Sequence, residues 1–244
     1  MAWQTPKTDW TAADGVRDAD MNRIEENILE LHNETVRESK IVYVSKSGDD
    51  YSGIGTSSRP YYTIQKAIDS IPKQLKGLDI TVYVSDGAYE EAVVVNGFSG
   101  GTLTFTGNAA DVTVHSITVE DSSVYCTSFN LILTAAVGLI VARGSFSTTG
   151  DIAANNSSTA VNANSGSTVH ISGVLNSRAS TAVSCSGSSR VYADTISGTG
   201  SLSASTGGVI AFNSSTLTRV TASGGRINTG SQGTGGGVLP ATLE

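Results

Sequence analysis

A repeat of about 22 residues constrains the fold of this chain more than any other feature of the sequence. The first residues of five successive triplets are 22, 22, 22 and 19 positions apart, and each triplet has further apolar segments beside it. Three short strand signals in a repeat of this length are typical of one rung of a β-solenoid. No helical pattern of usable length interrupts the repeat, which argues against βαβ units and leucine-rich repeats. The triplets are Ser123-Val124-Tyr125, Ser145-Phe146-Ser147, Ser167-Thr168-Val169, Ser189-Arg190-Val191 and Gly208-Val209-Ile210.

A single rung cannot bury its inward Val, Ile and Leu side chains, whereas stacked rungs form one continuous core. The composition agrees with this fold, because only 15% of the residues are charged and Gly, Ser and Thr are abundant. We therefore predict an all-β chain in which residues 79–223 form a right-handed parallel β-helix. Residues 224–244 are Gly-rich and lack the period, so we expect a flexible or extended C-terminal tail.

Residues 41–78 are predicted to form a cap on the first rung. An alternating strand is followed by a turn rich in Gly, Ser and Asp, and then by a short helix that Pro72 ends. The apolar residues of this helix are Ile64, Ile68 and Ile71, and Thr63 stands at its N-cap position. Because the open end of a solenoid exposes apolar core and unpaired strand edges, we expect the three isoleucines to be buried against the first rung.

The segment Val42–Pro72 resembles the opening of pectate-lyase-like right-handed parallel β-helix domains. The likeness lies in the strand, the loop with G-x-G, a proline and then T-I-Q-K-A-I at residues 63–68. This resemblance implies that the short helix closes the first rung. The loop also holds two adjacent acids, Asp49 and Asp50, which are fewer than a calcium site needs. We expect both to be exposed.

Residues 18–40 are predicted to form a helical stem. Met21, Ile24, Ile28 and Leu31 are spaced by 3, 4 and 3 positions, which is the a/d seam of a short coiled coil. One alternative is a helix that packs on its own domain. We favour a stem that associates with copies of itself in a parallel homotrimer, because the flanking positions are wholly polar and so narrow a stripe would bury little on its own.

Residues 1–17 form a polar arm that carries the only two tryptophans of the chain, Trp3 and Trp10. Tryptophan is a favoured anchor residue in protein interfaces. The arm therefore either packs on the stem of its own chain or anchors the protein in a partner.

Residues 3–31 resemble the N-terminus of tail and baseplate proteins from phages and prophages of Gram-positive bacteria. Those proteins share a K-T-x-W motif and a following D-x-N-R-I-E-x-N-I helix. The resemblance implies that this end docks on the tail, that the distal part meets the host surface, and that the protein belongs to a virion or tail-like particle. The matching residues are Lys7, Asp9, Trp10, Asn22, Arg23, Ile24, Glu25, Asn27 and Ile28. With Trp3, the first three of these are the predicted attachment residues.

The predicted solenoid is poor in catalytic groups. Its acids, Asp111, Glu120, Asp121, Asp151 and Asp194, form no Asp-x-Asp pair, and Asp194 stands one to two residues earlier in its repeat than Asp151. His115 and His170 are single histidines, and the basic residues are likewise single: Arg143, Arg178, Arg190 and Arg219. We therefore predict no catalytic residue, no metal site and no cofactor, and favour a non-enzymatic function. A site assembled from acids of different chains remains the alternative.

Net charge, hydropathy and cysteine content bear on which partners, location and cross-links are expected for the chain. The net charge of -7 argues against nucleic acid, which requires clustered Lys and Arg. The most apolar run, Leu131–Ala142, is shorter than the roughly 20 residues of a membrane helix, so no membrane insertion is expected. No secretory signal is visible, which predicts synthesis in the bacterial cytoplasm. Cys126 and Cys185 are interpreted as small buried hydrophobic residues rather than as a disulfide.

Together these features predict a structural and receptor-binding component of a phage tail. Its expected partners are two further copies of the chain, a tail or baseplate protein at the N-terminus, and either a host cell-surface glycan or a further distal protein. The alternative is a tailspike-type polysaccharide depolymerase, a lyase or glycoside hydrolase acting on host glycans. A surface adhesin unrelated to phage is disfavoured, because the sequence lacks a signal peptide and a working sortase motif.

Overall fold

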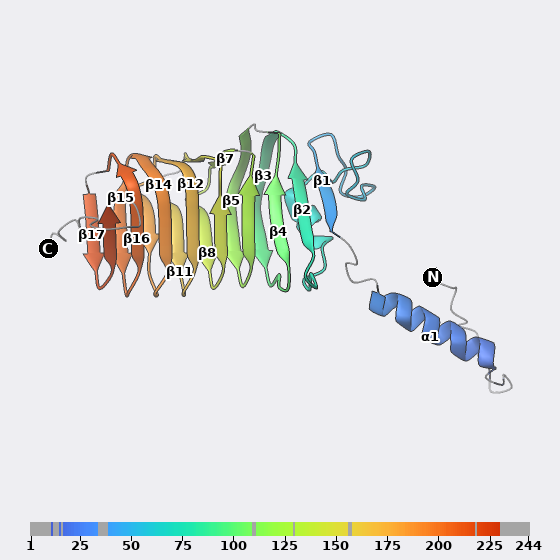
Figure 1. Cartoon of the computed structure of the whole chain (residues 1–244). Coiled ribbons are helices and arrows are strands. Elements are labelled where there is room, and N and C mark those ends of the chain that lie inside the picture. The colour runs from blue at the N-terminus through green and yellow to red at the C-terminus, as the bar shows by residue number, and fades with distance from the viewer. Residues whose placement is uncertain are drawn as a thin grey trace.

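The chain folds into a parallel β-solenoid, shown in Figure 1. The structure, a computed structural model, describes residues 11, 15, 17–33, 39–108, 111–128, 130–155, 158–217 and 219–229, with side chains in the first helix described as far as Asn27. The elements are α1 (Asp18–Asn33), β1 (Lys40–Val44), α2 (Ile64–Asp69), β2 (Asp79–Val84), β3 (Gly87–Asn96), β4 (Thr102–Thr106), β5 (Asp111–Glu120), β6 (Ser123–Thr127), β7 (Asn130–Leu133), β8 (Val137–Ala142), β9 (Ser145–Thr148), β10 (Ile152–Ala154), β11 (Thr159–Asn164), β12 (Thr168–Ser177), β13 (Thr181–Cys185), β14 (Arg190–Gly198), β15 (Ser201–Ser205), β16 (Val209–Ser215), β17 (Arg219–Ser223) and β18 (Arg226–Thr229).

The strands stack in three faces along the solenoid, and every strand pair within a face is parallel. Some long strands bend around a corner: β3 and β5 pass from face 2 to face 3, and β12, β14 and β16 pass from face 1 to face 2. Face 1 contains β1, β2, β4, β6, β9, the first parts of β12, β14 and β16, and β18. Face 2 contains the first parts of β3 and β5, then β7, β10 and the last parts of β12, β14 and β16. Face 3 contains the last parts of β3 and β5, then β8, β11, β13, β15 and β17.

The register confirms the predicted repeat with one correction. Ser123 lies opposite Ser145, as predicted, but the partner of Ser145 in the next rung is Thr168 rather than Ser167. The reason lies in the preceding turn, where Ser165 and Gly166 both have positive φ, whereas the turn before Ser145 has a single such residue. One additional turn residue shifts the strand by one position, and a shift of one exchanges inward and outward side chains. Ser167 is accordingly buried.

The corner from face 3 to face 1 uses a left-handed backbone conformation in each of seven successive rungs. Glycine adopts this conformation freely, whereas other residues do so at a cost of about 1–2 kcal/mol. Repetition of the same conformation in register lets each rung turn at the same place, so that rungs lie flat on one another. The residues of this column are Gly97, Asp121, Arg143, Ser165, Gly187, Thr206 and Gly224.

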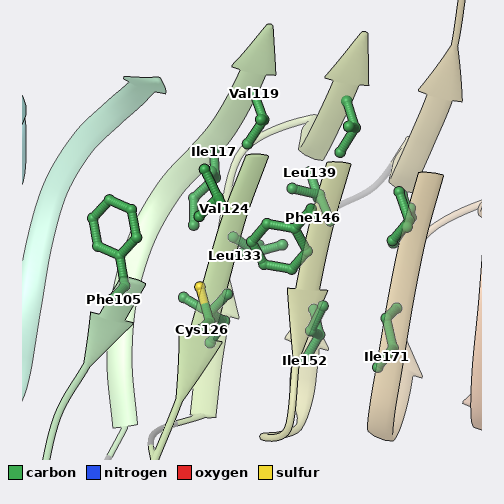
Figure 2. Close-up of a cluster of buried hydrophobic side chains, with 14 of the residues drawn as sticks. Phe105, Ile117, Val119, Val124, Cys126, Leu133, Leu139, Phe146, Ile152 and Ile171 are labelled. Atoms are coloured by element: carbon green, nitrogen blue, oxygen red, sulfur yellow. The ribbon is translucent and has the colours of Figure 1, made fainter. Parts of the chain in front are cut away.

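The core runs along the inside of the three faces. Figure 2 shows side chains from neighbouring rungs, among them Phe105, Cys126 and Phe146, directed into the interior. Burial raises the pKa of the Cys126 thiol, and neither cysteine is in a disulfide, as expected. A cavity of about 20 Å³ lies among these side chains, which is room for little more than one water molecule. The interior is therefore a packed core rather than a ligand channel.

The cap forms largely as predicted. Ile64, Ile68 and Ile71 are buried, and the Thr63 hydroxyl accepts a hydrogen bond from the Lys66 amide at 3.2 Å. Helix α2 ends at Asp69, so Ile71 packs from the turn that follows it. The prediction for Asp50 was wrong. Its side chain is half-buried, because its carboxylate accepts hydrogen bonds from the Tyr62 and Thr63 amides and from the Thr63 hydroxyl.

The predicted segment boundaries shift at both ends. Lys40, the last residue of the predicted stem, begins β1, and residues 34–38 lie outside the described part of the chain. The rest of β1 lies in the segment predicted as cap, and the strand pairs with β2 along its whole length, so regular pairing begins before residue 79, the first residue of β2. At the other end β18 pairs with β16, so regular pairing continues into the segment predicted as tail. The right-handed sense of the coil stays a prediction.

Candidate functional sites

The predicted attachment residues Trp3, Lys7, Asp9 and Trp10 lie outside the residues that the structure describes. Their role in docking therefore stays a prediction that rests on the sequence resemblance.

Helix α1 carries the predicted stem residues. Figure 1 shows this helix apart from the solenoid, beyond the end that β1 forms. Met21 and Ile24 are 46% and 42% exposed, although they are the first two residues of the apolar seam. The side chains of Ile28 and Leu31 lie outside those described, while their backbone is part of the helix. A coiled coil is not seen in this single chain.

The polar face of α1 shows the opposite pattern. Asp20 and Asn27 are buried, although they are polar. Burial acts to raise the pKa of Asp20, but hydrogen bonds from the Arg17 amide and guanidinium outweigh it and hold the pKa below its usual value. Arg23 lies 3.4 Å from the other carboxylate oxygen of Asp20. The described part of α1 thus leaves its apolar seam in water, where an unpartnered apolar surface is unfavourable.

Three of the acids considered as catalytic candidates lie at the corner between faces 1 and 2, namely Asp111, Asp151 and Asp194. Asp111, Asn130 and Asp151 occupy equivalent positions in successive rungs. The Asn130 amide donates to Asp111 at 3.2 Å, and its carbonyl accepts from the Asp151 amide at 3.1 Å. Asp194 stands one position earlier in its rung, as the sequence indicated, and accepts from Asn213 at 3.1 Å. Hydrogen bonds thus link Asp111, Asn130 and Asp151 from rung to rung, and they join Asp194 to Asn213 as a separate pair. We call these residues the acid ladder, and the hydrogen bonds give them a structural role.

The other charged candidates also have local partners. Asp121 and Arg143 face each other across one rung, with hydrogen bonds of 2.9 and 3.0 Å, and the Arg143 guanidinium holds the pKa of Asp121 below its usual value. From the sequence Arg143 was interpreted as a single charge, because its pairing with Asp121 depends on the register between the two rungs. Glu120 accepts from Asn96 at 3.1 Å. His170 lies 6.2 Å from the Tyr192 ring, centroid to centroid, and joins no metal-binding group among the described residues.

A cleft of about 370 Å³ opens where the cap meets the first rung, and we call it the cap cleft. Sequence reasoning missed it, because its lining comes from the loop after β1, the turn before α2 and strand β3. No local motif links these segments, and only their packing brings them together. The cap cleft is lined by Lys46, Tyr62, Thr63, Ala88, Tyr89, Glu90 and Glu91.

Glu91 fixes one wall of the cap cleft. Its two carboxylate oxygens accept hydrogen bonds from the amides of Ile64 and Gln65, at 2.8 and 2.9 Å. These amides belong to the first turn of α2, where no intrahelical acceptor exists. The side chain of Glu91, which belongs to the first rung, therefore caps the N-terminus of α2. Beside it Tyr89 is buried, and burial together with nearby Glu91 raises its pKa to about 12.

Comparison of the chain with known protein families, with curated proteins and with solved structures finds no match. Over the described residues no helix is both long enough and apolar enough to cross a membrane. The arrangement therefore offers three features on which a function can be argued: the exposed seam of α1, the acid ladder at the corner of faces 1 and 2, and the cap cleft.

Proposed function

We propose that the protein is a structural and receptor-binding component of a phage tail or tail-like particle. In this proposal its N-terminal arm docks on the particle, its helix associates with two further copies, and its β-solenoid projects toward the host surface. The proposal draws on the N-terminal sequence resemblance for the particle and on α1 for the assembly.

The observation that carries the proposal is the exposure of Met21 and Ile24 on α1. A helix in a monomer normally turns its apolar stripe toward its own core. Here the described apolar residues of α1 face water, while Asp20 and Asn27 are buried. Association of three such helices through an a/d seam would bury these side chains and form a short coiled coil.

The mass of the full chain in solution tests the assembly. We expect about three times the 25.1 kDa of one chain by light scattering. Ile24→Lys places a charge in the seam and should yield monomers, whereas Asn22→Lys places the same charge on the polar side and should leave the trimer intact. A monomeric wild-type chain with a folded helix, or equal behaviour of the two variants, would contradict the trimeric stem.

Docking is tested separately through the arm. We expect Trp3→Ala together with Trp10→Ala to reduce incorporation of the chain into tail particles that lack it, measured by immunolabelling in electron microscopy. Unchanged incorporation of this variant would refute the attachment role of the arm.

The alternative is a tailspike-type depolymerase, and the acid ladder is the observation that favours it. Asp111 and Asp151 lie two rungs apart, a backbone spacing of roughly 9.6 Å at ~4.8 Å per strand. This is close to the upper limit of about 9.5 Å for the carboxylates of an inverting glycosidase. Release of reducing ends or unsaturated uronates from host glycans would establish the activity. Its loss in Asp151→Ala or Asp194→Ala, but not in Glu120→Gln, would locate the site in the ladder.

A further inference from the structure

The cap cleft holds a lysine in an aromatic setting. The Lys46 ammonium nitrogen lies 3.8 Å from the centroid of the Tyr62 ring and 5.0 Å from that of Tyr89. Such cation–π contacts fix the position of the ammonium group. Among the ion pairs of the described residues none involves Lys46. An ammonium group has three N–H donors, so Lys46 retains donors for a molecule in the cleft.

Three other lining side chains are already committed to the fold. Both carboxylate oxygens of Glu91 accept from the amides of α2, and the Tyr89 hydroxyl donates to the Ser85 carbonyl at 2.8 Å. The Thr63 hydroxyl donates to Asp50 at 2.7 Å. These hydrogen bonds hold the walls of the cap cleft in place. A bound molecule would therefore meet a largely preformed site, as is usual for small-molecule sites.

The groups left for a ligand are the exposed part of one aromatic ring that Lys46 does not cover, one donor and one acceptor. Tyr62 is exposed, Lys46 supplies N–H donors, and Glu90 is an exposed carboxylate that lines the same cleft. A hexose matches this set, because one face of its ring presents C–H groups to an aromatic surface and its hydroxyls both donate and accept. The cleft volume of about 370 Å³ also lies within the range of about 300–1,000 Å³ for small-molecule sites.

We propose that the cap cleft binds a neutral hexose unit of a glycan. The sugar lies against the exposed part of the Tyr62 ring beside the Lys46 ammonium, one hydroxyl donates to Glu90, and another accepts from Lys46. The charges that line the cap cleft favour a neutral sugar over an acidic one. The lining contains one cation, Lys46, and two carboxylates, Glu90 and Glu91, so an added carboxylate on the ligand would be repelled.

This site is independent of the trimeric stem and of docking on a particle. It is formed by segments of one chain, and none of its lining residues belongs to α1 or to the acid ladder. A monomeric chain that binds sugar would refute the stem and leave the cleft proposal standing. A trimeric chain that binds no sugar would refute the cleft proposal and leave the trimeric stem standing.

Saturation-transfer NMR with the full chain tests the proposal. The probes are glucose, galactose, mannose and N-acetylglucosamine as neutral hexoses, with glucuronate as the acidic match of glucose. We expect saturable binding of at least one neutral hexose with a dissociation constant on the order of 1 mM, and weaker binding of glucuronate than of glucose. Tyr62→Ala and Lys46→Gln should each weaken the binding at least about tenfold.

Two variants outside the cleft serve as controls. Tyr51→Ala removes an aromatic ring that is fully exposed in the cap loop, and Lys66→Gln removes an exposed lysine on α2. Both should bind the sugar as the wild type does, and circular dichroism should show that all four variants are folded. The proposal is overturned if no neutral hexose binds the wild-type chain. It is equally overturned if Tyr62→Ala and Lys46→Gln bind no more weakly than their controls, or if glucuronate binds more tightly than glucose.

Discussion

Replacement of Glu91 by alanine should loosen the cap and leave the distal solenoid unchanged. Its two oxygens hold the Ile64 and Gln65 amides at 2.8 and 2.9 Å, and Glu91→Ala leaves both amides without this acceptor. A hydrogen bond to a charged group contributes about 1.5–3 kcal/mol. Because Glu91 is only half-buried, water can replace part of the loss, and we expect a total of about 2–3 kcal/mol.

Hydrogen exchange of individual amides is the suitable assay, because a solenoid is quasi-one-dimensional and its rungs open locally. A loss of about 2–3 kcal/mol corresponds to exchange that is roughly 30–150 times faster. We expect this acceleration at the Ile64 and Gln65 amides and over the rest of α2. Amides of β14 and β16, several rungs away, should exchange at the wild-type rate.

Glu90→Ala is the matched control. Glu90 is the adjacent residue of β3, is exposed, and lines the cap cleft without any hydrogen bond to α2 among those described. Its replacement should change stability by no more than about 0.5 kcal/mol. The capping argument is refuted if the two variants accelerate exchange in α2 equally. An equal acceleration throughout the solenoid in Glu91→Ala would also refute it, since the effect would then be global.

The remaining predictions concern the core, a turn and the thiols. Phe146→Ala should lower the free energy of unfolding by about 3–5 kcal/mol in urea titrations, because its ring is fully buried; a loss under about 1 kcal/mol would contradict the core packing. Ser165→Gly should raise the free energy of unfolding by about 0.5–1 kcal/mol, because Ser165 has a φ of 57°, which glycine adopts without strain. Ser165→Ala should give no gain in the same titration. Cys126 and Cys185 should react with a thiol reagent only on unfolding, since both are buried and burial raises their pKa; rapid labelling of the native chain would show that the core opens.

The repeat and the cap were predictable from the sequence because both are periodic. Inward residues recur once per rung on each face, so spacing alone located the rungs, and the isoleucine spacing of α2 identified its buried side. The one-residue error at Ser167 arose where periodicity gives no signal. A second positive-φ residue, Gly166, lengthens this turn, as Ser188 and Gly207 do in the next two rungs, and a turn of small polar residues and Gly looks the same with or without it.

Contacts between distant segments were not predictable. Asp50 was expected in water, yet it binds amides 12 and 13 residues further along the chain. Arg143 was treated as a single charge until the register placed it opposite Asp121. Each contact depends on which residue of one rung lies over which residue of the next, and a single sequence gives the approximate period but not the exact alignment.

The sequence by itself therefore determined that this chain forms stacked rungs behind a helical cap, because burying apolar residues with a regular period requires that arrangement. It also indicated an apolar seam on the stem helix. Only the tertiary structure decided where specific groups converge. Lys46, Tyr62 and Glu90 belong to three separate segments, and they share a cleft because Glu91 of the first rung holds the start of α2. A long-range hydrogen bond of this kind leaves no pattern in the sequence, since its partners are 26 and 27 residues apart and follow no period.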